Sequence, residues 1–405
     1  MSRELLVGLD IGSSNIRVIA ATLLEDFQLE IIGYSQLKSK GIKKGSLINF
    51  EAAYSSVDEA IAEAEKMAGT EFESAFVSIS GAHIYSLNSS GRVTITNPRK
   101  EITVDDISAV INASKTVQLP HGKEILHVIP SQFIVDNNEG IKDPHGMVGE
   151  TLEVEVHIIA ADSMALQNFR RVVERAQLGI EEFILESVAS AEAVLTEDEK
   201  NLGVLFINFG GGTTDISVYQ NGVPVYSSVL PIGGEHVTND IAICLKISTS
   251  EAEKLKFEYG YACSDFIERD EKIEIQEMVI SRRELCKIIE VRVEELFTLI
   301  FSQIEKYFPS LSSIVITGDS ANLNGLVDLL KKMLGEKMLP VKIGKPRFDG
   351  EVQIIGFQEK LMTPGFSTAI GLLLIGVINR MAQSELEKGS IVKKIIDSLK
   401  SIIGK

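Results

Sequence analysis

Cysteine and tryptophan are scarce in this sequence. Its 405 residues include no tryptophan and three cysteines, Cys244, Cys263 and Cys286, an odd number without CxxC spacing. Such usage argues against a disulfide framework and predicts a reduced, cytosolic compartment. A chain of this length suggests two to four domains, each able to bury a core without disulfides or metals.

Long hydrophobic runs are also missing. The longest, 369–378, is far short of the ~20 residues that a membrane-spanning helix needs, and two glycines interrupt it. The apolar stretch 5–9 is too short for a secretory signal, since Asp10 follows it directly. We therefore expect neither a signal peptide nor a segment that spans a bilayer.

Positive charge is in deficit. The chain has 40 lysines and arginines against 57 acidic residues, which gives a formal net charge of −17. Nucleic-acid binding needs a basic field, so this balance argues against nucleic acid as the main partner. Taken over the whole chain, the same balance argues against an anionic membrane.

One sequence pattern occurs twice. Residues 5–19 read as an apolar strand, a turn of small residues and a second strand, and residues 204–218 repeat this order. Aligning Asp10 with Asn208 also aligns Gly12 with Gly210. We infer two related halves. Around these hairpins strands alternate with helices, which predicts α/β domains.

Helix-capping residues mark the start of several helices. Asp162 can cap a helix over 163–178. Ser281 and Glu284 form a capping box before a long helix that Pro309 ends. These helices are expected to be core-facing scaffolding.

The stretch from about His83 to Ala160 differs from its surroundings. It has short alternating strands at 92–96, 125–135 and 151–159, and one helix near 103–116. This pattern predicts a small α+β module inserted into the first half.

Each repeat contains a tight turn of glycine, serine and threonine. Such a turn points several backbone N–H groups and hydroxyls toward one place, with no Cβ atoms to block approach, and so forms an anion cradle. One such turn indicates only a hairpin, but a matched pair could hold a nucleotide's phosphates, with Asp10 supplying charge for Mg²⁺. The chain has no Walker P-loop, and its turns lead into strands where a dinucleotide fingerprint would open a helix.

These turns carry a resemblance to known proteins. Residues 10–14 and 209–215 resemble the phosphate motifs, and 316–321 the adenosine motif, of the superfamily that contains actin, DnaK-type chaperones and sugar kinases. More narrowly, nearly the whole chain resembles the FtsA family of bacterial division proteins. The supporting stretches are 77–84, 97–103, 126–130, 139–142, 189–195 and 368–373. The resemblance implies an α/β, actin-like two-domain fold of duplicated, ribonuclease-H-like halves with an inserted small α+β subdomain.

The same resemblance predicts domain boundaries. Residues 1–83 begin actin-like domain I, which 161–200 and about 362–382 complete, and 84–160 form the inserted subdomain. Domain II has its core in 201–247 and 310–361 and its outer subdomain in 248–309. A linker, 383–390, leads to a terminal helix, 391–405.

By resemblance, ATP and Mg²⁺ bind in a cleft between the halves. The implied nucleotide-binding residues are Asp10, Gly12, Ser13, Ser14, Asn15, Gly210, Gly211, Gly212, Thr213, Thr214, Gly233, Gly234, Glu253, Lys256, Gly318 and Asp319. Asp10 would hold Mg²⁺ through water, with a weaker contribution from Asn208. From spacing alone, Glu253 and Lys256 read as an intrahelical ion pair.

Three departures from the family pattern weaken the expected ATPase. Asn208 stands where the second phosphate motif usually begins with Asp, and an amide carries no charge to Mg²⁺ or to an attacking water. Asp319 replaces a usual Gly, so its carboxylate must point away from the phosphates or nucleotide affinity suffers. Asn15 stands where many relatives carry Lys. We predict an ATPase that is slow at most, and from the scattered histidines we predict no other metal site.

The last fifteen residues have a positive net charge, unlike the chain as a whole. Apolar residues from Ile391 to Ile403 recur at helical spacing on one stripe, and the segment carries four lysines and one aspartate, a net charge of +3. Such a helix, about 20 Å long, is too short to span a bilayer but can lie in its interface, with lysines on anionic headgroups. The predicted membrane-contacting residues are Ile391, Val392, Lys393, Lys394, Ile395, Ile396, Leu399, Lys400, Ile402 and Ile403. The alternative is that this helix packs against the rest of the protein. The resemblance favours membrane binding, because members of the FtsA family end in a membrane-targeting helix.

The resemblance implies an actin-like membrane tether for the division ring. FtsZ would dock through its C-terminal peptide near Arg283, Arg292 and Glu295, although a charged helix face is more often merely solvated. The chain would polymerise, recruit later division proteins and bind anionic lipid at the cytoplasmic face of the inner membrane, at the septum. The alternatives are a sugar or acetate kinase, which Asn208 disfavours for want of a base, and a pilus-assembly relative, which the tail disfavours.

Overall fold

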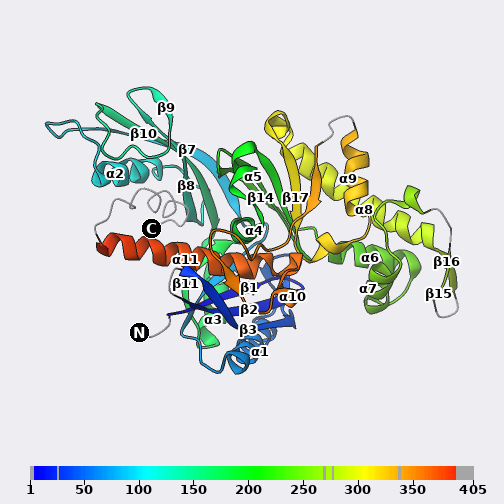
Figure 1. Ribbon diagram of the computed structural model, residues 1–405. Coiled ribbons are helices and arrows are strands. Elements are labelled where there is room, and N and C mark those ends of the chain that lie inside the picture. Colours follow the sequence, from blue (N-terminus) through cyan, green and yellow to red (C-terminus); the bar gives the residue numbers. More distant parts are fainter. Residues whose placement is uncertain (1–3, 25–26, 268–270, 276–277, 336–338, 389–405) are drawn as a thin grey trace.

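The computed structural model describes residues 4–24, 27–267, 271–275, 278–335 and 339–388. Figure 1 shows two halves, each built on a sheet, with the strands β1 to β3 of the first half below those of the second. A smaller module with β7 to β10 extends to the upper left, and α6, α7 and α8 extend to the right.

The first half contains a six-stranded sheet in the order β11-β6-β1-β2-β3-β19. Its strands are β1 (Glu4–Ile11), β2 (Asn15–Leu23), β3 (Leu29–Lys38), β6 (Ser74–Ile79), β11 (Gly179–Leu185) and β19 (Ile354–Ile355). Helices cover both faces, which is why β1 and β2 read as nearly continuous apolar runs. Leu6 packs with α4 (Glu186–Val194) and α11 (Ser367–Lys388), while Val7 packs with α1 (Phe50–Ala68) and α3 (Ser163–Arg175).

The second half repeats this sheet. Its five strands lie in the order β14-β13-β12-β17-β18, which matches β3-β2-β1-β6-β11 position by position. The strands are β12 (Val204–Phe209), β13 (Thr214–Gln220), β14 (Val223–Leu230), β17 (Ser313–Thr317) and β18 (Val341–Ile343). The duplication inferred from the two hairpins is therefore present throughout both sheets.

The inserted module is a four-stranded sheet, in the order β7-β10-β8-β9, with one helix against it. Its elements are β7 (Tyr85–Thr94), α2 (Val104–Ser114), β8 (Lys123–Val135), β9 (Asn138–Ile141) and β10 (Thr151–Asp162). His157 joins it to the second half, because its ring nitrogens lie 2.7 Å from Asn88 Oδ1 and 3.0 Å from Ser227 Oγ on β14. Burial lowers the pKa of His157 to about 3, so the ring is neutral in this contact.

Helices α6 to α9 build the outer part of the second half. The main elements there are α6 (Gly234–Leu245), α7 (Thr249–Glu258), η2 (Ser264–Phe266), β15 (Lys272–Ile275), β16 (Met278–Ser281), α8 (Arg282–Gln303), η3 (Glu305–Ser310), η4 (Asp319–Asn322) and α9 (Leu326–Leu334). The remaining short elements are β4 (Ile42–Lys43), β5 (Ser46–Leu47), α5 (Glu197–Leu202), α10 (Gln358–Leu361) and η6 (Pro364–Phe366). The capping box predicted at Ser281 and Glu284 starts α8.

Helix α11 runs between the two halves. The segment Pro364–Met381 has the length and hydropathy of a membrane span, but 72% of it is buried inside the protein. Two glycines allow this packing, since a Cβ on Gly371 would lie 1.7 Å from the carbonyl oxygen of Ala189 in α4, and one on Gly376 would lie 2.9 Å from the Phe76 ring. The apolar run 369–378 is therefore part of a core helix.

One predicted helix boundary is wrong, and one segment predicted as a linker is largely helical. The helix predicted over 163–178 ends at Arg175, because Gln177 adopts a left-handed conformation and Gly179 already begins β11. The predicted linker 383–390 is helical as far as Lys388, where α11 ends. Its Gln, Glu and Lys residues are good helix formers, so a polar composition does not by itself interrupt a helix.

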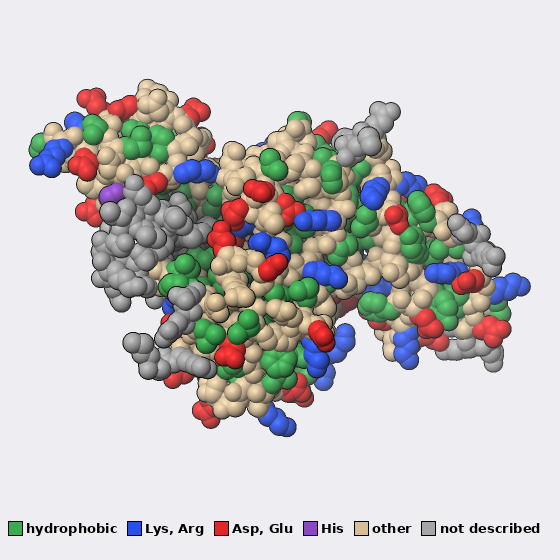
Figure 2. Space-filling model, in the orientation of Figure 1, with side chains coloured by type: hydrophobic (Ala, Val, Ile, Leu, Met, Phe, Trp, Pro, Cys, Tyr) green, Lys and Arg blue, Asp and Glu red, His purple; other side chains and the backbone are tan. Residues whose placement is uncertain are grey.

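Acidic and basic side chains are mixed over the face of the molecule that Figure 2 shows. Lysine and arginine are spread between the module, the halves and the outer helices, with acidic residues among them. On this face the described residues form a surface of both signs, without a single continuous basic area.

Candidate functional site

The two repeated turns have the same backbone geometry. Gly12 N–H donates to the carbonyl of Asn15 at 3.1 Å, and Gly210 N–H donates to that of Thr213 at 3.0 Å. Below the first turn Asp10 pairs with Arg17 in the strand register, and below the second Asn208 pairs with Asp215. Matched turns thus place matched pairs of polar side chains in the two halves.

The two turns touch across the cleft. A Cβ on Gly211 would lie 1.8 Å from Ser14 Oγ, and one on Gly212 would lie 2.6 Å from Ser13 Oγ. The two serines are themselves held, because Ser14 Oγ donates to Glu235 Oε1 at 2.5 Å and Ser13 Oγ accepts from Gly45 N–H at 2.9 Å. Only glycine fits at these two positions of the second turn.

A cavity of about 700 Å³ opens beside the turns. This volume lies within the usual range for small-molecule and cofactor sites. The predicted nucleotide-binding residues that line it are Ser13, Ser14, Asn15, Gly211, Gly234, Glu253, Lys256 and Asp319. These residues come from both halves, so the structure brings together the side chains that the motifs single out.

Glu253 and Lys256 form the ion pair that their spacing predicts, and both line the cavity. Lys256 Nζ lies 2.8 Å from Glu253 Oε2 in an ion pair on α7, and it donates to Thr238 Oγ1 at 2.9 Å and to the carbonyl of Gly234 at 3.3 Å. Both side chains also line the cavity. The intrahelical pair thus forms part of the cavity wall.

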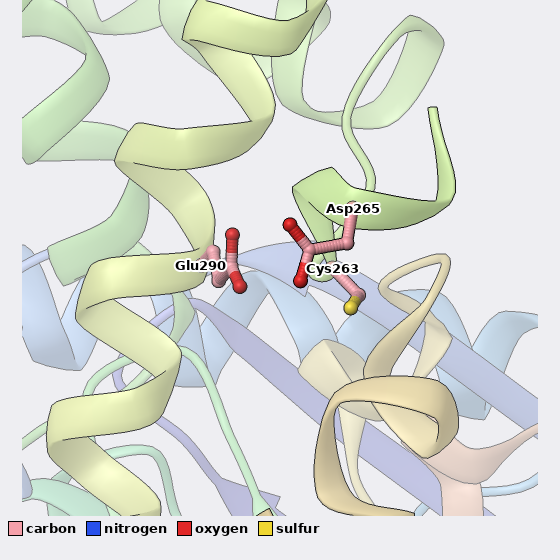
Figure 3. Close-up of side chains that lie close together, drawn as sticks. All are labelled: Cys263, Asp265 and Glu290. Atoms are coloured by element: carbon pink, nitrogen blue, oxygen red, sulfur yellow. The ribbon is translucent and has the colours of Figure 1, made fainter. Parts of the chain in front are cut away.

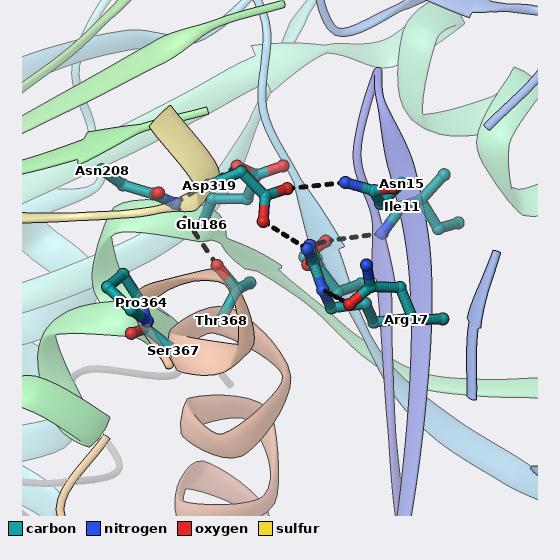
Figure 4. Close-up of polar contacts among 12 residues, drawn as sticks. Ile11, Asn15, Arg17, Glu186, Asn208, Asp319, Pro364, Ser367 and Thr368 are labelled. Atoms are coloured by element: carbon teal, nitrogen blue, oxygen red, sulfur yellow. Dashed lines mark hydrogen bonds and ion pairs between the residues drawn. The ribbon is translucent and has the colours of Figure 1, made fainter. Parts of the chain in front are cut away.

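A second, smaller space adjoins the turns, and we call it the acid chamber. It has a volume of about 30 Å³, and its wall contains Asp10, Arg17, Glu186, Asn208 and Asp319. Figure 4 shows Glu186, Asn208 and Thr368 on one side and Arg17 and Asn15 on the other, with Asp319 between them. Gly12, Gly210, Thr213 and Gly318 of the predicted set also line this chamber.

Carboxyl groups in and near the acid chamber are buried and hard to ionise. Burial raises the pKa of Asp10 to about 6 and that of Glu186 well above its usual value. Burial also raises the pKa of Asp215 to about 8, although Ser80 Oγ donates to its Oδ2 at 2.7 Å. Two of these acids, Asp10 and Glu186, interact with the buried guanidinium of Arg17, and the third, Asp215, interacts with Asp10.

Mg²⁺ fits this donor set. Asp215 Oδ1 is buried without a hydrogen-bond partner among the described residues, and Ser78 Oγ holds Asp10 by donating to its Oδ1 at 2.8 Å. Carboxylate oxygens are the ligands that Mg²⁺ prefers, and a divalent cation would favour the ionised form of the nearby acids.

Asp319 points across the cleft, toward β2 of the first half. Its Oδ1 lies 2.5 Å from Arg17 Nη2, and its Oδ2 accepts from Asn15 Nδ2 at 2.7 Å. Burial opposes its charge, but Arg17 and Asn15 outweigh burial and lower its pKa. The sequence analysis missed Arg17, because this residue matches no motif and its partner lies far along the chain.

Glu186 and Asp215 are further polar residues that the predicted site lacked. Asn208 Nδ2 lies 3.4 Å from Glu186 Oε2 and 3.3 Å from Thr368 Oγ1. Asp215 ends the motif 209–215, and Glu186 stands three residues before the stretch 189–195 begins, at the point where β11 leads into α4. An acid where a buried strand meets a buried helix is a signal that could have identified Glu186.

Three predicted residues line neither space. Gly212 contacts Ser13, Thr214 Oγ1 donates to the carbonyl of Ile232 at 2.7 Å, and Gly233 precedes α6 as its N-cap. Glu235, in the first turn of α6, is the residue that the prediction lacked here. These residues hold the second turn and α6 together.

The residues predicted to contact FtsZ take part in bonds within the chain. Arg292 on α8 forms ion pairs with Asp240, at 2.5 Å, and with Glu295. Arg283 Nη2 donates to the carbonyl of Ile267 at 2.6 Å. The residues predicted to contact the membrane, all between 391 and 403, lie outside the described residues.

Cys263, Asp265 and Glu290 form a cluster between η2 and α8 that has the spacing of metal ligands (Figure 3). Lys332 Nζ already lies 2.6 Å from Asp265 Oδ2 and 2.9 Å from Glu290 Oε1. Burial raises the pKa of Glu290, but bonds from Ser264, Lys332 and Lys287 outweigh burial and bring it down to about 2. An ammonium thus neutralises the carboxylates, and we assign no metal here.

Comparison with protein families gives two matches. The profile described as "Cell division protein FtsA" matches residues 205–371. The profile described as "SHS2 domain inserted in FTSA" matches residues 81–160, which contain the inserted module.

Whole-length relatives carry the same description. The FtsA cell division protein of Borreliella burgdorferi is 39% identical, with 99% of this chain and 96% of the relative covered. That of Pseudomonas aeruginosa is 37% identical, with 93% and 90% covered. That of Bacillus subtilis is 36% identical, with 94% and 86% covered.

Solved structures show the fold class. The PilM-PilN type IV pilus biogenesis complex matches with a TM-score of 0.67 at 19% identity, covering 93% of this chain and 99% of the other. MreB 5 of Spiroplasma citri bound to AMPPNP matches with a TM-score of 0.56 at 13% identity, covering 96% and 100%. The predicted actin-like α/β fold with its inserted module is confirmed.

Proposed function

Because this chain belongs to the FtsA family of cell division proteins, we propose that it binds ATP with Mg²⁺ in the cleft between its halves and tethers FtsZ filaments to the inner membrane. The main observation in support of ATP binding is that two matched glycine turns touch beside a cavity of about 700 Å³. MreB 5, a structural neighbour, was solved bound to AMPPNP.

Each part of the cleft has a role in this proposal. The turn residues Ser13, Ser14, Gly211 and Thr213 would face the phosphates, and Lys256 would border the nucleoside. Asp10 and Asp215 would hold Mg²⁺, which supplies positive charge against the phosphate oxygens when bound.

Hydrolysis would be slow. Asn208 carries no charge to orient a water molecule, and its amide cannot take up the proton that the water would release. We therefore assign the ATP chiefly to holding the two halves together.

The membrane part of the proposal depends on the terminal segment 391–405, with its net charge of +3 against an acidic body. The FtsZ part depends on the outer helices, where Arg292 and Glu295 lie on α8. Self-association into filaments and recruitment of later division proteins through the inserted module complete the proposed role, at the cytoplasmic face of the septum. The family assignment replaces the kinase and pilus-assembly alternatives.

Removing the terminal segment should release the protein from anionic vesicles. We expect truncation after Gly389 to lower the fraction that co-sediments with vesicles containing phosphatidylglycerol at least tenfold, because each lysine near the surface contributes about 1 kcal/mol and the apolar stripe contributes more. The measurement is co-sedimentation with ATP present and absent.

A matched charge control uses the body of the protein. Replacing the exposed Lys345 and Lys360 by glutamate should leave binding unchanged, whereas replacing Lys393 and Lys394 should weaken it. Equal pelleting of the full chain and the truncated chain would show that the terminal segment is not the tether.

A further inference from the structure

Asp319 lies at the boundary between the cavity and the acid chamber. Both spaces are lined by Asp319 together with Ser13, Ser14, Asn15 and Gly211. A group that reaches from the cavity into the chamber therefore passes between these shared residues, of which Asp319 is the one that carries a charge. Figure 4 shows this carboxylate directed at Asn15 and Arg17.

The two bonds of Asp319 join the halves of the protein. Asp319 begins η4, which follows β17 of the second half, while Asn15 and Arg17 are on β2 of the first half. The ion pair to Arg17 and the hydrogen bond from Asn15 thus cross the cleft at the level of the glycine turns. In the absence of a ligand these bonds help to close it.

Arg17 needs an anionic partner. Its side chain is 5% exposed, lies against the Phe366 ring and is 3.7 Å from Asp10, a more distant partner than Asp319. A buried guanidinium without a close anion is strongly unfavourable. A guanidinium binds carboxylate and phosphate with the same fork of donors, so a phosphate could take the place of Asp319.

The Asp319 side chain is 34% exposed, unlike that of Arg17. It can therefore leave the pair toward the cavity side, while Arg17 stays where it is. Gly365 packs against the pair from the other side, since a Cβ there would lie 2.3 Å from Asp319 Oδ1. The Arg17–Asp319 pair can therefore open toward the cavity, which is the side from which a nucleotide would enter.

We propose that Asp319 is an internal anion that a nucleotide must displace from Arg17, and that it sets how strongly the cleft prefers ligands with long phosphate chains. This inference rests on the proposed nucleotide-binding function. A triphosphate reaches the chamber and takes over Arg17, but it loses affinity in displacing Asp319. A monophosphate that stays in the cavity leaves the pair closed.

Equilibrium binding of ATP, ADP and AMP in the presence of Mg²⁺ tests this proposal. For D319A we expect the Kd for ATP to fall at least tenfold, which is about 1.4 kcal/mol, with a smaller gain for ADP and less than a twofold change for AMP. D319N keeps the size of the side chain and removes its charge, and it should give the same order of effects. D349A, which removes an exposed acid, should bind all three nucleotides like the wild type.

The outcomes separate this proposal from the proposed function. If both variants bind ATP no more tightly than the wild type, while Gly211→Ala still weakens ATP binding at least 100-fold, Asp319 is not an internal anion and the nucleotide site stands. A gain of equal size for AMP would also overturn the proposal, because it would indicate a general loosening of the cleft. If neither wild type nor variants bind ATP, the proposed function and this inference both fail. Thermal unfolding of D319A and of D319N identifies any loss of folding in either variant.

Discussion

Replacing Gly211 by alanine is expected to weaken ATP binding at least 100-fold. The added Cβ would lie 1.8 Å from Ser14 Oγ, and the serine cannot move aside freely because it donates to Glu235. The two turns must then separate, and the anion cradle that they form together is lost. Isothermal titration with ATP and Mg²⁺ measures the effect, which corresponds to about 2.7 kcal/mol of binding free energy.

Gly350 provides the matched control for this substitution. Its nearest neighbour for an added Cβ is the Arg347 side chain at 3.7 Å, and its backbone is not left-handed, so alanine fits there without strain. Gly350→Ala should bind ATP like the wild type. Normal ATP binding by Gly211→Ala would mean that the nucleotide site lies elsewhere.

Replacing Asp215 by asparagine is expected to stabilise the nucleotide-free, Mg²⁺-free protein at pH 8. The native pKa of Asp215 is about 8, whereas an unfolded aspartate titrates near 3.8. Between these values the folded protein holds a proton that the unfolded chain releases, so the free energy of unfolding falls as the pH rises. The stabilisation that comes from this proton on Asp215 is present in full below about pH 4 and is lost by about pH 8. Asparagine does not titrate, and it can still accept from Ser80.

Chemical denaturation in EDTA at several pH values measures this difference. We expect the variant to unfold with a free energy on the order of 3 kcal/mol above that of the wild type at pH 8, and with no advantage at pH 4. Asp58→Asn, at an exposed position on α1, should match the wild type at both pH values. A constant difference across the pH range would show that the effect is not due to ionisation of Asp215.

The sequence predicted those parts of the fold that short-range patterns determine. The repeated hairpin predicted the duplication, because Asp10 to Asn15 and Asn208 to Thr213 have nearly the same local chemistry. Side-chain caps also predicted where α3 and α8 begin. The end of α3 was missed, because the left-handed turn at Gln177 follows from packing onto β11.

The site was predicted only as far as its motifs extend. The glycine turns, Glu253 and Lys256 were found, since each lies in a recognisable stretch. The pairing of Arg17 with Asp319 was not, because the two residues are 302 positions apart and only the folded chain brings them together. The raised pKa values of Asp10 and Asp215 likewise arise from burial, which the motif sequence does not reveal.

Helix α11 connects the cleft to Lys388, the last described residue of the chain. Its first turn contacts the second half, where Ser367 Oγ lies 2.6 Å from Thr317 Oγ1 and Thr368 Oγ1 accepts from Asn208. Its 22 residues make a rod ~33 Å long. A rotation of about 5° at the first turn moves the far end by ~3 Å for a rod of that length. A change in the closure of the cleft that turned α11 in this way would therefore displace Lys388, the last described residue.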